Sequence, residues 1–240
     1  MKLIENYVEK KLDKLNLQRF ASAFFCGIIF SMAVIGSVTF STLAQGIMSK
    51  ILLSVTFPMG LFIIVANGYD LFTSSVMNFK KLTRPKKRGY AGLAVSVVYI
   101  GNLLGTVFAI FVLHALGVLE RLHLVEAFYS IYISKTSLLP YQVLFLGVLC
   151  NFLICMAVYL SLHGESFLEK CAYMFIPVFL FVLLGFEHSV ANMVYFSAAI
   201  FSSKAAVMPA LLNIFFATIG NLGGGLLFLF SVWAKTGKKI

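Results

Sequence analysis

Charged residues are scarce in this chain, and acidic residues are the scarcest. Only 12% of the 240 residues are charged, and nine Asp and Glu stand against 19 Lys and Arg. A soluble domain usually carries about 25% charged residues, so this composition excludes one. The four cysteines show neither a disulfide framework nor metal-ligand spacing and are expected to be small apolar packing residues. The glycine-rich run Gly220–Gly225 follows no strand, so neither a phosphate loop nor any cofactor is predicted.

Apolar residues make up 60% of the chain, and the mean hydropathy is +0.96. A membrane-spanning helix needs about 20 mainly apolar residues. Six stretches meet this requirement: Ala21–Leu43, Ile51–Phe79, Tyr90–Leu119, Thr136–Leu162, Cys171–Phe201 and Ala205–Ala234. They predict an all-α membrane protein with six transmembrane helices in one domain, residues 21–235. Residues 1–20 predict an amphipathic cytoplasmic helix, and residues 236–240 a cytoplasmic tail.

The basic residues are divided unevenly between the two sides of the membrane. With six spans, the termini share a side with the second–third and fourth–fifth loops, and that side holds 15 of the 19 Lys and Arg. The other side holds Lys50, Arg121, Lys135 and Lys204. Because basic residues favour the cytoplasmic side, we expect a multi-pass protein of the cell membrane with both termini in the cytoplasm. The basic clusters lie at membrane borders next to lipid, so no nucleic-acid partner is expected.

Two of the apolar stretches are interrupted by a glycine, an aromatic residue and a carboxylate. The first interruption is Gly68-Tyr69-Asp70, and the second is Gly185-Phe186-Glu187. A carboxylate at the centre of a spanning helix costs about 2.5–3.5 kcal/mol on insertion scales, so such residues usually mark a site or a pathway. The repeated interruption predicts that the second and fifth helices are broken.

The two halves of the chain correspond to each other. Met32-Ala33-Val34 matches Met156-Ala157-Val158, Gly68 matches Gly185, and Ile100-Gly101-Asn102 matches Ile219-Gly220-Asn221. Each half has three spans, so the second half must enter the membrane upside down. The pattern predicts an inverted 3+3 repeat, with repeat one over about 21–119 and repeat two over about 135–235.

Four segments resemble the signatures of the formate/nitrite transporter family. Phe57–Ser74 is similar to the second-span signature and Gly185–Met193 to the fifth, while Leu149–Val158 and Asn213–Gly225 resemble the fourth and sixth spans. The resemblance implies an aquaporin-like fold, a homopentamer in membrane lipid, and one pore per protomer for small monovalent anions such as formate, nitrite or hydrosulfide. Asn67-Gly68-Tyr69 stands where formate channels usually carry Gly-Ala, which leaves the choice among these anions open.

The resemblance also implies roles for individual residues. His188 matches the central pore histidine, with Thr73 within reach of it. Lys135 and Asn213 match a polar pair that attracts anions in the outer vestibule. Five apolar residues match those that narrow the pore on either side of the histidine: Phe57, Leu61, Leu71, Phe72 and Phe181.

The residues also allow less specific readings. The alternative role of His188 is that of a buried structural histidine, that of Thr73 is to bond an unwound carbonyl, and that of Lys135 is to be an ordinary interfacial lysine. Asp70 and Glu187 would repel an anion at close range, so we expect them to turn away and accept bonds from backbone N–H groups as a loop scaffold.

A bare carboxylate pays tens of kcal/mol to enter an apolar medium, so two apolar constrictions predict that a weak acid crosses in its neutral form. His188 would either relay the proton or hydrogen-bond the passing species, and the pore would be a channel or a proton-coupled carrier. The alternative is an aquaporin-type channel for neutral solutes, although no asparagine is followed by proline here. An intramembrane enzyme is disfavoured because no nucleophile, metal set or second base accompanies His188.

Overall fold

The computed structural model describes residues 16–77, 88–203 and 205–237, and every regular element in these ranges is a helix. The elements are α2 (Asn16–Ser41), α3 (Gly46–Thr56), α4 (Pro58–Ala66), α5 (Phe72–Ser75), α6 (Arg88–Ala115), α7 (Val118–Arg121), α8 (Val125–Thr136), α9 (Pro140–Ser161), α10 (Phe167–Leu183), α11 (Ser189–Ser202) and α12 (Val207–Thr236). The helix expected over residues 1–20 and the tail over 236–240 lie largely outside the described residues.

Five segments of the described ranges are long and apolar enough to cross a membrane: α2, α3 with α4, α6, α9 and α12. The remaining predicted crossing is divided between α10, with 17 residues, and α11, with 14. The prediction of an all-α membrane fold is therefore confirmed, and the fifth span is broken as expected.

Some boundaries differ from those predicted. α2 already includes Asn16, before the predicted start at Ala21, and it buries Arg19, whose guanidinium donates to the Asn16 side chain. The fourth span begins at Pro140, because proline favours the first helical position and the chain before it belongs to another helix. That helix, α8, was not predicted, since its serines and Lys135 make it too polar to stand out as a span.

Both interruptions end a helix in the same way. Gly68 and Gly185 have φ of +69° and +70°, in the left-handed region where a side chain is strained. The Gly68 N–H donates to the carbonyl of Val65, and the N–H of the next residue, Tyr69, donates to that of Ile64. The bonds at Gly185 and Phe186 repeat this arrangement 117 residues later. The two glycines thus turn the chain out of α4 and out of α10.

A pair of asparagines holds the two breaks. Asn102 on α6 accepts the Phe72 N–H at Oδ1 (2.8 Å), and its Nδ2 donates to the carbonyls of Ala23 (2.8 Å) and Asp70 (3.0 Å). The amide group therefore joins the first break to α2. Each of its three bonds satisfies a main-chain group in the fully buried interior.

Asn221 on α12 makes the equivalent bonds at the second break. Its Oδ1 accepts the Ser189 N–H (2.9 Å), and its Nδ2 donates to the carbonyls of Gly147 (2.9 Å) and Glu187 (2.8 Å). Ser189 and Glu187 lie 117 residues after Phe72 and Asp70, the separation of Gly68 and Gly185, and Gly147 lies 124 residues after Ala23, the separation of Met32 and Met156. The repeat is therefore present in individual hydrogen bonds and not only in the order of helices.

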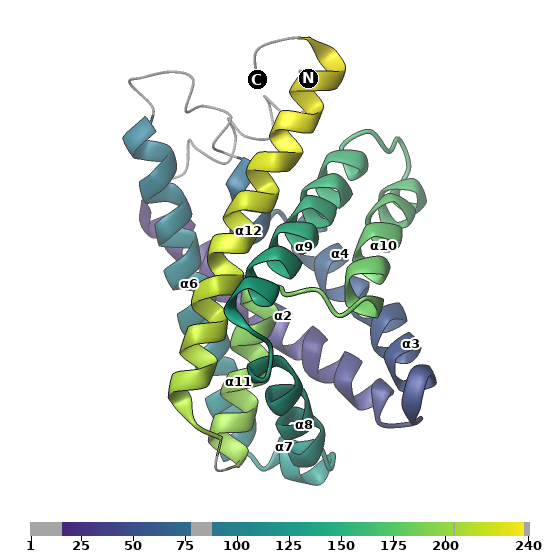
Figure 1. Cartoon of the computed structure of the whole chain (residues 1–240), viewed down its shortest axis with the longest axis vertical. Coiled ribbons are helices and arrows are strands. Elements are labelled where there is room, and N and C mark those ends of the chain that lie inside the picture. Colours follow the sequence, from purple (N-terminus) through teal and green to yellow (C-terminus); the bar gives the residue numbers. More distant parts are fainter. Residues whose placement is uncertain (1–15, 78–87, 204, 238–240) are drawn as a thin grey trace.

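The helices of the two halves run in opposite directions. Figure 1 shows α2 and α6 running toward the end of the bundle where α7 and α8 lie, whereas α9 and α12 run away from that end. α2 packs along α6 as α9 packs along α12. A Cβ at Gly105 would overlap the Phe24 carbonyl, and a Cβ at Gly224 would overlap that of Val148. The inverted 3+3 repeat is therefore confirmed, and these glycines allow the paired helices to approach closely.

Replacing Asn221 by leucine keeps the number and branching of the side-chain heavy atoms and removes all three bonds. The Ser189 N–H and the Glu187 carbonyl would then be buried without their partner, at about 1–3 kcal/mol each. We expect Asn221→Leu to lower the midpoint of thermal unfolding in detergent by several degrees. Asn67→Ala is the control, because Asn67 is exposed and bonds only within its own helix. Equal midpoints for the two variants would contradict the role assigned to Asn221.

Candidate functional site

A cavity of about 670 Å³ lies between α3 and α8 and extends to the second break. Its wall carries polar and basic side chains: Gln45, Ser49, Lys50, Ser130, Ser134 and Lys135. Its inner end is lined by Phe57, Phe181 and His188. The cavity therefore leads from a polar mouth to the predicted central histidine, and we call it the outer vestibule after the side on which the charge distribution predicts it to lie.

His188 occupies the N-cap position of α11, directly after the second break. Its Nδ1 accepts the backbone N–H of Ala191 (3.0 Å), and its Nε2 lies 3.4 Å from Oγ1 of Thr73. Because an amide N–H can only donate, Nδ1 carries a lone pair and the ring is neutral with its proton on Nε2. The contact to Thr73 is at the long end of hydrogen-bond distances, so Nε2–H remains able to donate to another acceptor.

Thr73 comes from the first break, so the structure brings the two predicted partners together from opposite halves. Thr73 is fully buried, and His188 is 3% exposed. The carbonyl of Thr73 accepts a bond from Nδ2 of Asn151 (3.2 Å), which also donates to the Asn221 carbonyl (2.6 Å). Asn151 on α9 therefore links the short helix α5 to the asparagine that holds the other break.

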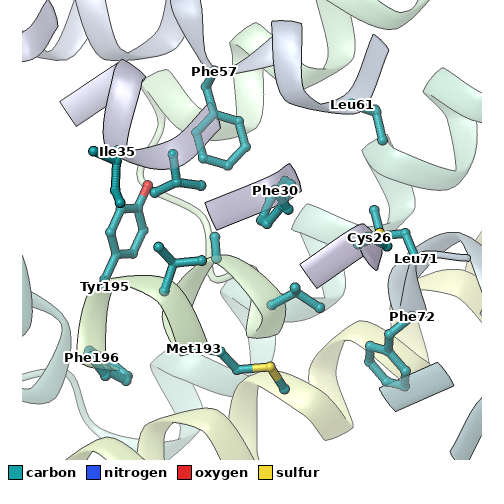
Figure 2. Close-up of a cluster of buried hydrophobic side chains, with 14 of the residues drawn as sticks. Cys26, Phe30, Ile35, Phe57, Leu61, Leu71, Phe72, Met193, Tyr195 and Phe196 are labelled. Atoms are coloured by element: carbon teal, nitrogen blue, oxygen red, sulfur yellow. The ribbon is translucent and has the colours of Figure 1, made fainter. Parts of the chain in front are cut away.

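Four aromatic rings form a closed ring of contacts around the inner end of the vestibule. His188 stacks on Phe30 (5.5 Å between ring centroids) and on Phe181 (5.8 Å). Phe57 meets both phenylalanines edge-on, at 5.6 Å from Phe30 and 5.7 Å from Phe181. Figure 2 shows Phe30 directly next to Phe57. We call these four residues the aromatic tetrad.

Sequence reasoning placed three members of the tetrad at the site and missed Phe30. Phe30 lies within α2, far from either break, and nothing in the sequence distinguishes it from the other 24 phenylalanines. The three remaining constriction candidates are buried and do not line the outer vestibule: Leu61, Leu71 and Phe72. Figure 2 shows them on the side of Phe30 opposite Ile35, and the Phe72 ring packs on Tyr99 of α6 (4.8 Å).

Glu187 is buried, but its partners differ from those expected. The carboxylate accepts from Nζ of Lys135 (2.8 Å) at one oxygen, and from the side-chain amides of Asn192 (2.6 Å) and Asn213 (3.3 Å) at the other. The expectation that backbone N–H groups bind this carboxylate is therefore wrong. The sequence did not reveal this because the donors come from α8, α11 and α12, which only the fold brings together.

Asp70, the other interrupting carboxylate, is also buried. Its backbone N–H donates to Oγ of Ser22 (3.1 Å), and its carbonyl accepts from Asn102. The main chain of this residue is thus fixed to α2 and to α6, which places it in the framework of the first break.

The structure brings Lys135 and Asn213 together, because Nδ2 of Asn213 donates to the Lys135 carbonyl (3.1 Å), but only Lys135 lines the vestibule. The charge of Lys135, however, is balanced by Glu187 at 2.8 Å. Lys50 lines the same cavity, is exposed, and has no ion pair with any of the described residues. The uncompensated positive charge at the mouth therefore belongs to Lys50, a residue that sequence reasoning placed on the outer side without assigning it a role.

Two broken helices, related by an inverted repeat and enclosing a buried histidine at the end of a polar vestibule, define a transport protein with a central pathway. A model of the formate/nitrite transporter family matches residues 1–234, and the chain belongs to this family. Its members are named as transporters and channels, so the protein is a multi-pass membrane transport protein and not an enzyme.

Several curated relatives are similar over most of their length. An uncharacterized transporter of Bacillus subtilis (strain 168), YrhG, is 32% identical, over 85% of this chain and 76% of that protein. A probable formate transporter of Methanothermobacter thermautotrophicus is 31% identical, over 75% of this chain and 72% of that protein. The formate channel FocA of Escherichia coli (strain K12) is 29% identical, over 93% of this chain and 88% of that channel.

Two solved structures have the same fold. A channel described as an FNT family ion channel superposes with a TM-score of 0.88 over 98% of this chain and 99% of that chain, at 23% identity. A pentameric formate channel with formate bound superposes with a TM-score of 0.79 at 27% identity, over 93% of this chain and 98% of that chain. The fold predicted from the sequence is therefore shared by known channels.

Separating Lys135 from Glu187 should destabilise the protein. Removing one member of a buried ion pair costs about 3–5 kcal/mol in soluble proteins, because it leaves the other charge uncompensated. We expect Lys135→Met and Glu187→Gln each to lower the midpoint of thermal unfolding by several degrees, and the double variant to recover part of the loss. Lys50→Met is the control and should leave the midpoint nearly unchanged. Strictly additive losses in the double variant would show that the two side chains do not depend on each other.

Proposed function

We propose that this protein carries small monovalent anions of the formate, nitrite or hydrosulfide class across the cell membrane, with one pore in each protomer of a homopentamer. The observation that carries the proposal is the neutral His188 ring, whose Nε2–H lies at the inner end of the outer vestibule. The relatives named for formate support the substrate class, and the excess of basic residues on one side supports cytoplasmic termini.

The apolar residues on both sides of His188 favour passage of a neutral species. A bare carboxylate would lose its hydration next to the tetrad and next to Leu61 and Leu71, at a cost of tens of kcal/mol in an apolar medium. The anion therefore takes up a proton at the inner end of the vestibule and crosses as the neutral acid. Nε2–H of His188 donates a hydrogen bond to an oxygen of the passing acid, with Thr73 as a second polar partner.

The hydrogen bond at Nδ1 favours a donor role for His188 over a relay role. A relay would require a second proton on Nδ1, where the Ala191 N–H already points. Protonation there would break the N-cap bond and bring two hydrogens together. We infer that the ring remains neutral during transport and that the transported proton is carried by the substrate itself.

The charges of the vestibule increase the local concentration of the anion. Lys50 provides the attraction at the mouth, and Lys135 adds a smaller part because Glu187 balances its charge. Asn213 contributes by holding the Lys135 carbonyl and the Glu187 carboxylate in place. Glu187 and Asp70 act as scaffold for the two breaks, and the Glu187 carboxylate does so through bonds to side chains.

The outside of the protomer is suited to lipid and to neighbouring protomers. Large apolar side chains are exposed along α2, α6, α9 and α12: Phe25, Met32, Phe40, Phe108, Phe111, Phe145, Phe215 and Phe230. In water such a surface would aggregate, whereas in a bilayer it contacts acyl chains or a second copy of the chain.

Transport by purified protein in proteoliposomes tests the proposal, after native mass spectrometry has established that the particle contains five copies. We expect uptake of formate, nitrite or hydrosulfide that increases as the external pH falls, because each anion crosses with a proton. His188→Asn keeps an N–H donor and a helix cap, so it should transport with the same direction of pH dependence. His188→Leu loses the donor and should reduce uptake by about tenfold, the effect of one hydrogen bond.

Three outcomes would contradict parts of this proposal. Glycerol uptake without anion uptake would support the aquaporin-type alternative. A flat pH profile in His188→Asn, with a sloping one in the wild type, would show that the imidazole itself carries the proton. A particle that is not a pentamer would contradict the proposed assembly.

The side of the membrane that Lys50 faces, and its charge, are tested by Lys50→Cys. In whole cells, this variant should show an apparent affinity for the anion that is lower by about threefold, with the maximal rate unchanged. A membrane-impermeant thiol reagent that attaches a positive charge should restore the affinity, and one that attaches a negative charge should lower it further. The wild-type protein treated with the same reagents is the control, since its own cysteines are buried or only partly exposed. If neither reagent changes the apparent affinity, the outer location of Lys50 or the role of its charge is contradicted.

A further inference from the structure

The direction of Nε2–H depends on the orientation of the whole His188 ring. The bond from Ala191 holds a single ring atom, Nδ1 (3.0 Å). A ring held by this one bond can still turn about its χ1 and χ2 torsions, which moves Nε2 away from Thr73 and breaks the bond to Ala191. A donor that serves a passing acid must be held in place by further contacts on the faces of the ring.

Two phenylalanines supply these contacts, one from each repeat. Phe30 stacks on His188 with an interplanar angle of 25°, and Phe181 does so with an angle of 26°. Phe30 comes from α2 in the first repeat, whereas Phe181 comes from α10 in the second. Rotation of the imidazole out of its plane would drive its edge into one of the two rings.

The Phe30 ring is itself fixed. It is only 2% exposed, and Phe57 meets it edge-on with an interplanar angle of 88°. α4 approaches it closely, because a Cβ at Gly60 would lie 3.7 Å from the Phe30 ring. Phe30 is therefore a rigid support and not a mobile side chain that adapts to the histidine.

Phe30 and Phe181 differ in their relation to the outer vestibule. Phe181 lines the cavity, so its removal would change both the histidine and the space open to the substrate. Phe30 contacts the histidine but is not among the residues that line the cavity. A substitution at Phe30 thus separates support of the ring from the shape of the vestibule.

We propose that Phe30 is a positioning residue for His188: it holds the imidazole in the single orientation in which Nδ1 caps α11 and Nε2–H points into the pathway. The proposal rests on the proposed function, since it assigns a residue that makes the donor effective. Phe30 does not bind the substrate in this scheme and acts only through the imidazole.

The first test is spectroscopic and does not need transport. In protein labelled with ¹⁵N at histidine, the His188 signals are identified by their loss in His188→Asn. The wild type should show one neutral tautomer, with the proton on Nε2. Phe30→Leu should show a mixture of both tautomers or averaged signals, because the ring can turn away from Ala191. An unchanged single tautomer in Phe30→Leu would overturn the proposal.

The second test is a double-mutant cycle in proteoliposomes. Phe30→Leu should reduce anion uptake by about tenfold when His188 is present, the effect of one misplaced hydrogen bond. In the His188→Asn background the same substitution should change uptake by less than about twofold, because the smaller amide is not held by stacking. An equal reduction in both backgrounds would show that Phe30 is a wall of the pathway and would also overturn the proposal.

Phe196→Leu is the matched control. Phe196 is a buried phenylalanine of α11 that packs on Tyr132 (5.8 Å), and Figure 2 shows it well away from Phe30. This variant should keep the wild-type tautomer and uptake. If Phe30→Leu does not assemble, Phe30→Met is measured in the same way. A wild type that shows the single tautomer but transports none of the anions would refute the proposed function and not the positioning by Phe30.

Discussion

Main-chain groups that a broken helix leaves without partners must be satisfied inside the protein, and this requirement shapes the whole bundle. Asn102 and Asn221 meet it with three bonds each, and each ties its break to a neighbouring helix. The residues bound at their Oδ1 atoms, Phe72 and Ser189, stand directly next to Thr73 and His188 in the chain. The polar centre of the pathway therefore takes its position from two asparagines that do not line the outer vestibule.

The residues that hold the two breaks follow the pseudo-twofold symmetry of the repeat, but the aromatic tetrad does not. The asparagines, the turning glycines and the close helix contacts all recur in both halves. The four members of the aromatic tetrad, by contrast, correspond to buried aliphatic residues of the other half: Ile64, Leu71, Ile154 and Met174. A symmetric scaffold thus holds a hydrogen-bonding aromatic layer on one side of the centre and an aliphatic layer on the other.

The sequence predicted what depends on local patterns. The length of the apolar stretches indicated the spans, and the repeated Gly-aromatic-acid interruption located both breaks. Both properties depend only on residues that are neighbours in the sequence. It did not predict the partners of Glu187 or the place of Phe30, since these depend on how α2, α8, α11 and α12 meet. The sequence did contain one signal for the two asparagines. Asn102 and Asn221 each follow a glycine within an apolar stretch, and a polar side chain in a membrane is costly unless its hydrogen bonds are satisfied.

The position of His188 at the start of α11 gives the ring two tasks at once. The lone pair that closes the first turn of the helix belongs to the same imidazole whose opposite nitrogen faces Thr73. Any residue that replaces this histidine must also occupy the N-cap position of α11 and accept the backbone N–H of Ala191. Asparagine, serine, threonine and aspartate do so, whereas leucine and phenylalanine do not. Substitutions at this position that preserve the start of α11 are therefore restricted to the few side chains that cap helices.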